Sequence, residues 1–226
     1  MGELHLFIIW HNARQKEKKL LQEIANKFDI AQTFDITWSE ELFSENLTRF
    51  YGKKLPKSDK KKEQCGTGSF LVIPVIDHNP LYEKGTNKNI IELKYKLRRI
   101  AKGINLIHGS DNKIETEENM MFLLGLTIGE FSAKYPQKKL EPIKINSEII
   151  GAPEWKNENE LVTFAKKIPQ TTIHKLRDTH MITTENVYKT SRLLNANKRV
   201  FMLKRNLYHI PIDGGSKPIY IRKIAA

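Results

Sequence analysis

The sequence has very little cysteine and no long apolar run. Among its 226 residues Cys65 is the single cysteine, so an intramolecular disulfide is excluded and a reducing cytoplasm is the expected location. No apolar run approaches the ~18 residues that a membrane-spanning helix needs, so no membrane span is expected. The first ten residues, MGELHLFIIW, contain no basic leader and too short an apolar run for a secretory signal peptide.

Acidic residues are scarce in the last third of the chain. The formal net charge is +12, and residues 136–226 hold 17 Lys and Arg against 8 Asp and Glu. Such an excess favours a polyanionic partner, which could be nucleic acid, an anionic membrane surface or a phosphorylated substrate. A lysine-rich surface that serves only solubility is the alternative interpretation.

Short apolar runs predict buried strands in the first 135 residues. In the predicted strand Phe70–Ile76, Pro74 favours a position at the edge of the sheet or at a bulge. Apolar residues at helical spacing predict three helices. The predicted strands are Leu6–Trp10, Ile30–Trp38 and Phe70–Ile76, and the predicted helices are Gln15–Phe28, a helix that starts at Ser39 and buries Phe43, Leu47 and Phe50, and Glu115–Leu124.

The order of these elements predicts the fold class. Strands and helices alternate as β-α-β-α-β and are followed by the basic segment LKYKLRRIAKG, a further strand and a last helix. This order is typical of a ferredoxin-like βαββαβ α/β (α+β) sandwich, with helices on one face of a mixed sheet. The lysine-rich stretch 53–68 is predicted to be an exposed, mobile loop. Residues 136–226 are predicted to be a basic C-terminal extension or a small mixed second domain after a 1–135 domain.

The stretch NLIHGSDNKIETEENMMFLLG, residues 105–125, has the composition of a phosphoryl-transfer site. Gly109 allows close backbone approach, and Ser110 and Asp111 can accept hydrogen bonds at the start of the coming helix. The imidazole of His108 is then free to attack a terminal phosphate and to hold it covalently. A histidine in an ordinary loop turn is the alternative.

This segment resembles the active-site segment of nucleoside diphosphate kinases, and the order of elements over residues 4–135 is similar too. The resemblance implies a phosphohistidine on His108, a Mg²⁺-bound nucleoside di- or triphosphate as substrate, and a homo-oligomer. It also implies nucleotide contacts from further residues: Asn105 to the ribose, Tyr51 as a wall of the site, Lys57 at the position of a phosphate-binding arginine, and Thr86.

The chain departs from the family pattern at three positions. Trp10 stands where the family has a phosphate-binding lysine, and Asn119 stands where it has a glutamate that supports the histidine. Tyr95 aligns with a phosphate arginine, although Lys94 and Arg98 are near enough to substitute for it. These departures indicate a different donor, a different acceptor or no catalysis.

Two hypotheses follow. The first is a nucleotide-binding phosphotransferase that works through His108, with a basic C-terminal third that recruits an anionic second substrate, such as a surface-polysaccharide precursor. The second is a non-catalytic module that binds nucleotides or nucleic acid. The seven histidines show no metal-ligand spacing, and neither glycine-rich turn is followed by the Lys-Ser/Thr of a phosphate-binding loop.

Overall fold

The chain divides into two compact units, Met1–Ile150 and Gly151–Ala226, which are described separately. The computed structural model describes residues 2–41, 43–51, 58–136, 142–146, 158–168, 170–177, 179–184, 190, 194, 201–204, 207–210 and 219–223. The division into 1–135 and 136–226 expected from the sequence stays a prediction. Within the described residues, no helix has the length and apolar character needed to cross a membrane.

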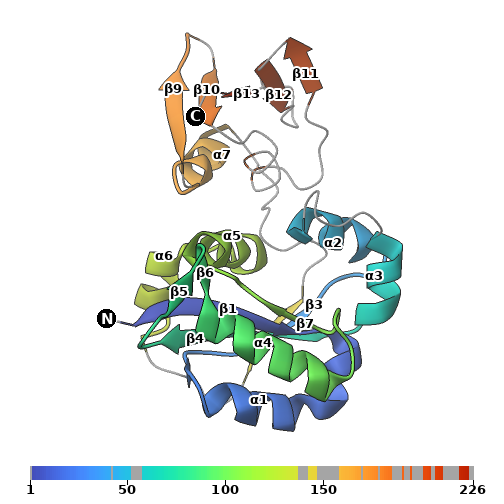
Figure 1. The fold of residues 1–226 in the computed structure, drawn as a ribbon. Helices are drawn as coiled ribbons and strands as arrows, with labels where there is room; N and C mark the ends of the chain where they lie inside the picture. The colour runs from blue at the N-terminus through green and yellow to red at the C-terminus, as the bar shows by residue number, and fades with distance from the viewer. Residues whose placement is uncertain are drawn as a thin grey trace. The chain divides into compact units, whose positions relative to one another are not determined.

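The first unit is built on one sheet, in the order β7-β1-β4-β3-β8 (Figure 1). Neighbouring strands are antiparallel except for the parallel pair β3–β8, and the short β2 also pairs with β4. The strands are β1 (Glu3–Ile9), β2 (Asp29–Ile30), β3 (Phe34–Thr37), β4 (Phe70–Asp77), β7 (Ile107–Gly109) and β8 (Ile143–Asn146), and β5 (Tyr82–Glu83) and β6 (Thr86–Asn87) form a separate hairpin. The order β7-β1-β4-β3, with helical crossovers, confirms the predicted ferredoxin-like α+β fold.

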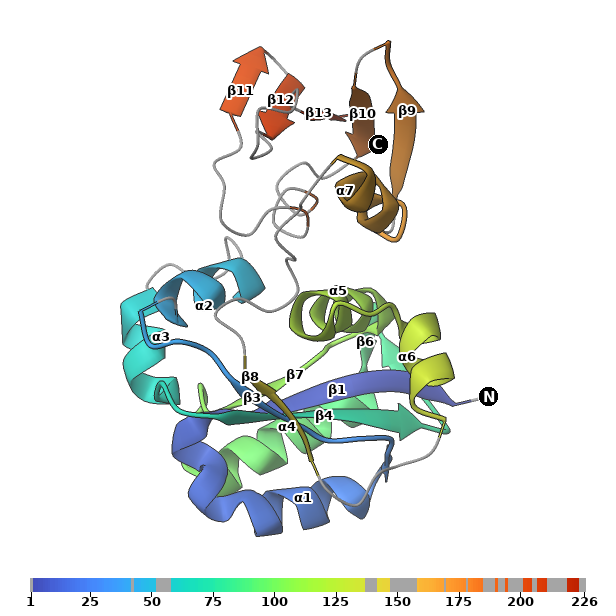
Figure 2. The same cartoon turned by 180° about the vertical axis from the view of Figure 1, so that it is seen from behind.

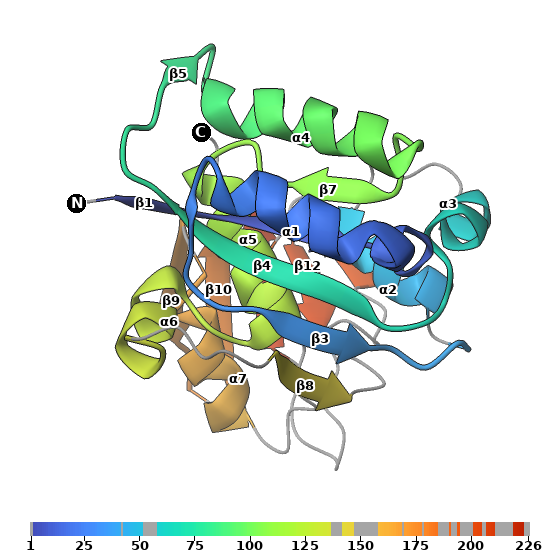
Figure 3. The same cartoon turned by 90° about the horizontal axis from the view of Figure 1, so that it is seen from below.

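Helices cover both faces of this sheet, so the prediction of helices on one face was wrong. Figures 1 and 2 show α1 and α4 on one face and α5 and α6 on the other, and Figure 3 shows α1 and α4 side by side across the strands. The described helices of the unit are α1 (Glu17–Ala25), α2 (Phe43–Tyr51), α3 (Ser58–Cys65), α4 (Lys88–Ala101), α5 (Lys113–Leu124) and α6 (Ile128–Lys134), together with a 3-10 turn, η1 (His11–Lys16).

The two faces of β1 account for this arrangement. Phe7 and Ile9 belong to a core that includes Leu20 and Ile24 of α1 and Leu97 of α4. Because successive residues of a strand point to opposite faces, Leu6 and Ile8 lie on the other face, and both are fully buried. A strand that is apolar on both faces needs cover on both, and α5 and α6 provide the second layer.

Two local expectations need correction. Residues 53–68 were predicted to be a mobile loop, but Ser58–Cys65 form α3, with Lys61 and Cys65 buried. Strand β4, which carries Pro74, is central and not at an edge. The bulge alternative describes Pro74 better, because the partner strand is interrupted there: β2 ends opposite Val75 and β3 begins opposite Val72. A missing N–H is tolerated at such an interruption.

The second unit contains a five-stranded sheet in the order β11-β12-β13-β10-β9. Strands β10 and β13 are parallel and the other neighbours are antiparallel. The helix α7 (Glu158–Ala165) buries Leu161 and Ala165 in this unit. The strands are β9 (Thr171–Lys175), β10 (His180–Thr184), β11 (Phe201–Lys204), β12 (Leu207–Ile210) and β13 (Ile219–Lys223).

Candidate functional site

His108 lies on the edge strand β7, directly opposite Ile8 of β1. Residues that face each other in a ladder point to the same side, so His108 projects toward the face that α5 covers. The strand is held at both ends by backbone hydrogen bonds, from Trp10 N to Leu106 O at 3.1 Å and from Ser110 N to Leu6 O at 3.0 Å. The position of the histidine is therefore fixed by the sheet and not by a flexible turn.

Three side chains surround the imidazole. The rings of Phe50 and Tyr51, at the end of α2, meet it edge to face, with centroid distances of 5.1 and 5.6 Å. Asn119 of α5 places its Nδ2 3.0 Å from His108 Nε2. His108 is 7% exposed, so the imidazole is held in a largely desolvated environment. Burial raises the pKa of the neighbouring Tyr51 hydroxyl, so this group stays protonated.

The residues after His108 act differently from the sequence prediction. Asn112, and not Ser110 or Asp111, caps α5, since its side chain accepts from Glu115 N at 2.9 Å. Ser110 is fully buried, accepts from Leu6 N at 3.1 Å and receives a hydrogen bond from Thr116 at 2.8 Å. Ser110 thereby ties β1 to α5 and stabilises the strand register on which His108 depends.

Lys94 and Arg98 lie on α4, next to β7. Lys94 forms an ion pair with Asp111 and donates to Gly109 O at 3.3 Å. Arg98 donates through Nε to Ile107 O at 3.2 Å. Both predicted cations thus contact the strand that carries His108, and the charge of Lys94 is balanced by a carboxylate.

Sequence reasoning missed Lys61, a buried cation that lies beside the predicted site residues Tyr51 and Asn105. Its Nζ donates to Asn105 O at 2.7 Å and to Asn105 Oδ1 at 3.2 Å, and it lies 5.0 Å from the centroid of the Tyr51 ring. Lys61 is 7% exposed, and burial lowers its pKa. Lys61 therefore joins Tyr51 to Asn105. The detectable signal was the spacing of Lys61 and Cys65, four residues apart and so on one side of a helix.

The predicted site residues are only partly brought together. Tyr51, Asn105 and His108 belong to one continuous group through Lys61 and the aromatic contacts. Thr86 lies in the β5–β6 hairpin, where its hydroxyl donates to Glu83 O at 2.9 Å. Lys57 lies outside the described residues.

Trp10 is the centre of an aromatic cluster beneath this site. Its ring lies 4.7 Å from Phe70, 6.2 Å from Phe50 and 6.5 Å from Tyr51, and it is fully buried. The large ring supports the α2 residues that contact His108. A lysine at position 10 would be an ammonium group in an apolar core, so this chain has no place there for a phosphate-binding cation.

The described residues contain no cluster of three His, Cys, Asp or Glu that could hold a metal ion. Near His108, Asp111 is paired with Lys94, and Glu115 accepts from Asp111 N at 2.7 Å. The acids present are thus engaged by protein groups. They do not fit a protein-built Mg²⁺ site, although Mg²⁺ is commonly held mainly by substrate phosphates.

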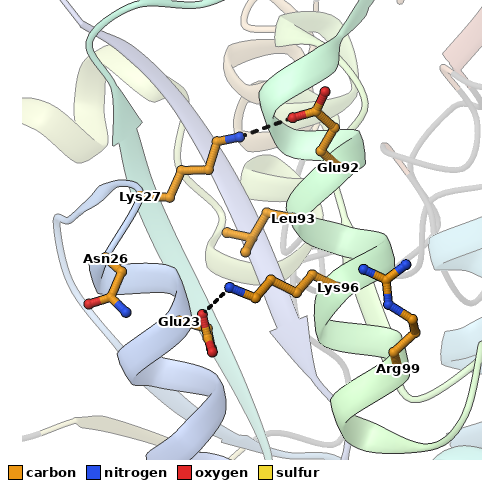
Figure 4. A pocket seen from close by; sticks show the side chains of 7 residues that line it. All are labelled: Glu23, Asn26, Lys27, Glu92, Leu93, Lys96 and Arg99. Carbon is orange, nitrogen blue, oxygen red and sulfur yellow. Dashed lines mark hydrogen bonds and ion pairs between the residues drawn. The ribbon is translucent and has the colours of Figure 1, made fainter.

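A cavity of about 410 Å³ lies between α1 and α4 (Figure 4). Two ion pairs cross it, Lys27 with Glu92 at 3.3 Å and Lys96 with Glu23 at 2.6 Å. Leu93 lies between these pairs, and Asn26 and Arg99 complete the lining. Since α1 and α4 cover the face of the sheet that carries Phe7 and Ile9, this cavity is not part of the His108 site.

Comparison with known proteins gives a structural likeness alone. No protein-family model matches the sequence, and no curated protein matches it. Several solved structures are similar to part of this chain, and two of them are nucleoside diphosphate kinases. One is the nucleoside diphosphate kinase of Aquifex aeolicus, 20% identical, covering 57% of this chain and 99% of its own, with a TM-score of 0.40.

The other is the nucleoside diphosphate kinase of Encephalitozoon cuniculi in its apo form, 16% identical, covering 59% of this chain and 98% of its own, with a TM-score of 0.41. The assignment of the fold rests on the strand order and register described above.

Proposed function

We propose that the first unit is a nucleotide-binding phosphotransferase that forms a phosphohistidine on His108. The observation that carries the proposal is the setting of this imidazole: a buried strand position, a hydrogen bond between Nε2 and the Asn119 amide, and two aromatic walls. The sequence resemblance around Asn105–Gly125 supports the same conclusion. A hydrogen bond at Nε2 holds the imidazole in one orientation, which suits the ring to nucleophilic attack through Nδ1.

The proposed reaction runs through Nδ1. For Nδ1 to carry a lone pair, the neutral ring must bear its proton on Nε2, and the Asn119 amide must present Oδ1 to it by rotation about Cβ–Cγ. Nδ1 then attacks the terminal phosphorus of a nucleoside triphosphate. The Nδ1–P bond forms, the P–O bond to the diphosphate breaks, and the diphosphate leaves with the bond electrons. Transfer to a second acceptor reverses these steps.

Charge neutralisation would come from this chain's own cations. Lys61, which lies 5.0 Å from the centroid of the Tyr51 ring, would contact a nucleotide that stacks near Tyr51, and Arg98 is adjacent to β7. Lys94 would have to exchange Asp111 for a phosphate oxygen. Mg²⁺, carried in by the nucleotide, would supply further neutralisation of the phosphate oxygens. Contacts from Lys57 and Thr86 to the nucleotide, assembly into homo-oligomers and a cytoplasmic location remain predictions.

The second candidate is a nucleotide-binding module without catalysis. Trp10 favours it, because the aromatic cluster fills the position of a phosphate-binding lysine in the resemblance. Fast phosphoryl transfer depends on preorganised positive charge, so a missing cation lowers the rate before it abolishes binding.

One experiment separates the two candidates. The purified protein is incubated with γ-labelled ATP, GTP and CTP plus Mg²⁺, and any protein-bound label is tested for acid lability. We expect an acid-labile, base-stable label that is absent from His108→Ala and retained in His78→Ala, which removes an exposed histidine elsewhere in the unit. A label that persists in His108→Ala would disprove the mechanism. No label from any triphosphate, combined with nucleotide binding in equilibrium dialysis, would leave the non-catalytic module.

A further inference from the structure

The strand that carries His108 has one edge without a strand partner. Among the described strands, β7 pairs only with β1. Leu106 O and Ser110 N form hydrogen bonds to β1. Because alternate residues of an antiparallel strand bond to the same neighbour, Ile107 and Gly109 direct their carbonyl groups away from β1. Helix α4 lies beside β7, and α3 lies near its N-terminal end (Figure 3).

Three cations from these two helices bind backbone carbonyls along β7 and the turn before it. The carbonyls belong to alternate residues, and each accepts from a different side chain: Asn105 O from Lys61 Nζ at 2.7 Å, Ile107 O from Arg98 Nε at 3.2 Å, and Gly109 O from Lys94 Nζ at 3.3 Å. Positions two residues apart on a strand are separated by about 7 Å. Lys61, Arg98 and Lys94 therefore form a row, and they are called the edge cations below.

Two of the edge cations have no counter-charge. In the part of the chain that the structure describes, neither Lys61 nor Arg98 forms an ion pair with a carboxylate. Lys61 is 7% exposed and Arg98 is partly buried. Burial lowers the pKa of Lys61, and the positive charge of Arg98 acts in the same direction. Desolvated cations without a carboxylate are costly, so an anionic ligand would stabilise both of them.

The third edge cation, Lys94, has a carboxylate that a ligand can replace. Lys94 pairs with Asp111, whose side chain is 39% exposed. The backbone of Asp111 is held separately, because its carbonyl accepts from Asn87 N at 2.7 Å and its N–H donates to Glu115 at 2.7 Å. The carboxylate can therefore turn toward solvent while Lys94 stays bound to Gly109 O.

The two residues that the family resemblance assigns to the nucleoside are engaged by protein groups. Asn105 Oδ1 accepts from Lys61 Nζ at 3.2 Å, and Asn105 Nδ2 donates to Gln64 Oε1. The ammonium group of Lys61 lies over the Tyr51 ring, 5.0 Å from its centroid. Recognition of a ribose by Asn105 would have to break these hydrogen bonds, whereas recognition of phosphate uses cations that lack a carboxylate partner.

We infer that the edge cations bind a linear chain of phosphates, and that inorganic tripolyphosphate binds there without a nucleoside. Phosphates joined by anhydride bonds carry negative charge at several points along a line, which matches a row of cations better than a single anion does. Lysine and arginine are the usual protein ligands of phosphate oxygens.

The use of such a chain as a phosphoryl donor rests on the function proposed above, but its binding needs no chemistry at His108. As a donor, the chain would pass its terminal phosphoryl group to Nδ1 of His108. The Nδ1–P bond would form, the anhydride P–O bond would break, and the shortened chain would leave with the bond electrons.

The first test is isothermal titration calorimetry of the full chain at low salt with inorganic tripolyphosphate, orthophosphate and ATP. Tripolyphosphate should bind as tightly as ATP. Orthophosphate, which can reach only one cation, should bind at least about tenfold more weakly. Binding of tripolyphosphate should persist in His108→Ala, so that failure of the phosphohistidine proposal would not affect this result.

Neighbouring residues provide matched controls for two of the edge cations. Arg98→Gln and Lys61→Gln should each weaken tripolyphosphate binding about tenfold, because each removes a charged hydrogen-bond donor from the row. Arg99→Gln changes the next residue of α4, which is exposed and lines the cavity between α1 and α4. Lys60→Gln changes an exposed lysine of α3. Both controls should bind like the wild type.

A change that increases affinity covers the case in which the loss variants fail to fold. Asp111→Asn should tighten tripolyphosphate binding about tenfold, because it removes the carboxylate that competes for Lys94. Asp29→Asn removes an exposed carboxylate elsewhere in the unit and should leave the affinity unchanged. Misfolding cannot produce a gain in affinity.

The inference would be overturned by no binding of tripolyphosphate at low salt, or by binding of ATP about tenfold or more tighter than tripolyphosphate, which would show that the nucleoside is recognised. It would also be overturned if folded Arg98→Gln bound like Arg99→Gln, or if Asp111→Asn bound like Asp29→Asn. The edge cations would then serve only to keep the edge of β7 from pairing with another chain.

Discussion

The amide of Asn119 in α5 lies against the imidazole of His108 in β7, with 3.0 Å between Nδ2 and Nε2. This contact joins the helix that follows the histidine to the strand that carries it, and it fixes the ring without a charge. An amide cannot compensate the positive charge that develops on an imidazole during phosphoryl transfer, whereas a carboxylate can.

The isosteric change Asn119→Asp should therefore raise the rate of His108 phosphorylation. A charge-assisted hydrogen bond is about twice as strong as a neutral one, and ~1 kcal/mol in the transition state corresponds to a roughly fivefold to tenfold increase. Single-turnover labelling with γ-labelled nucleotide measures the rate. Asn119→Leu, which removes the hydrogen bond, should be slower than the wild type, and equal rates in all three proteins would contradict the assigned role.

Position 10 should not accept the lysine that the family resemblance would place there. Trp10→Leu should lower the free energy of unfolding by about 2–4 kcal/mol, because it leaves a cavity among Phe70, Trp38 and Phe50. Trp10→Lys should cost more than Trp10→Leu, since it also buries an ammonium group. Urea unfolding curves for both variants test this, and a Lys variant as stable as the Leu variant would show that the cluster can admit solvent.

The thiol of Cys65 should lose its proton at a higher pH than an ordinary cysteine. Burial in α3 raises its pKa from the ordinary 9.0 to about 11, while Lys61 acts in the opposite direction. With a single cysteine in the chain, thiolate absorbance near 240 nm, corrected with Cys65→Ala for the tyrosines, reports this group alone. The expected midpoint is about 11 in the folded protein and close to 9 in urea.

The raised pKa of Cys65 makes the free energy of unfolding depend on pH. Because the folded pKa lies above the unfolded one, the unfolded state loses its proton first. The contribution of Cys65 is therefore fully present below pH 9 and declines as the pH rises toward 11, by about 1–3 kcal/mol. Cys65→Ala should lack this part of the decline, and parallel pH dependence in the two proteins would argue that the thiol is solvated.

Strand β8 should protect the edge of β3. Ile143 N donates to Thr33 O at 3.0 Å, and in a parallel ladder the N–H of the next residue, Lys144, points away from β3. Ile143→Pro should lower the free energy of unfolding by about 1–3 kcal/mol and promote self-association through the freed edge.

Lys144→Pro is the matched control, because it places proline on the same strand without removing a hydrogen bond to β3. Urea unfolding and sedimentation velocity measure the two effects. Identical behaviour of both variants would show that β8 does not protect the edge.

Local sequence was sufficient to predict most elements and the ferredoxin-like order. Apolar runs such as Leu6–Trp10 and Phe70–Ile76 specify buried strands, and the pattern from Glu115 to Gly125 specifies α5 together with its glycine C-cap, where φ is 66°. The candidate nucleophile was also visible, because His108 stands in a short contiguous motif. These features depend on residues close together in the chain, so periodicity and turn chemistry are sufficient to find them.

The surroundings of His108 depend on contacts between distant segments. Lys61 donates a hydrogen bond to Asn105, 44 residues away in the sequence. The lysine-rich composition of residues 53–68 had predicted a loop where Lys61 lies in the helix α3. Trp10 became the centre of an aromatic cluster because α2 and β4 bring Phe50 and Phe70 to it. The pairing of β8 with β3 depends on the register between two strands that are far apart in the sequence. Such contacts form only when the chain closes long loops, and no local pattern encodes which segments meet.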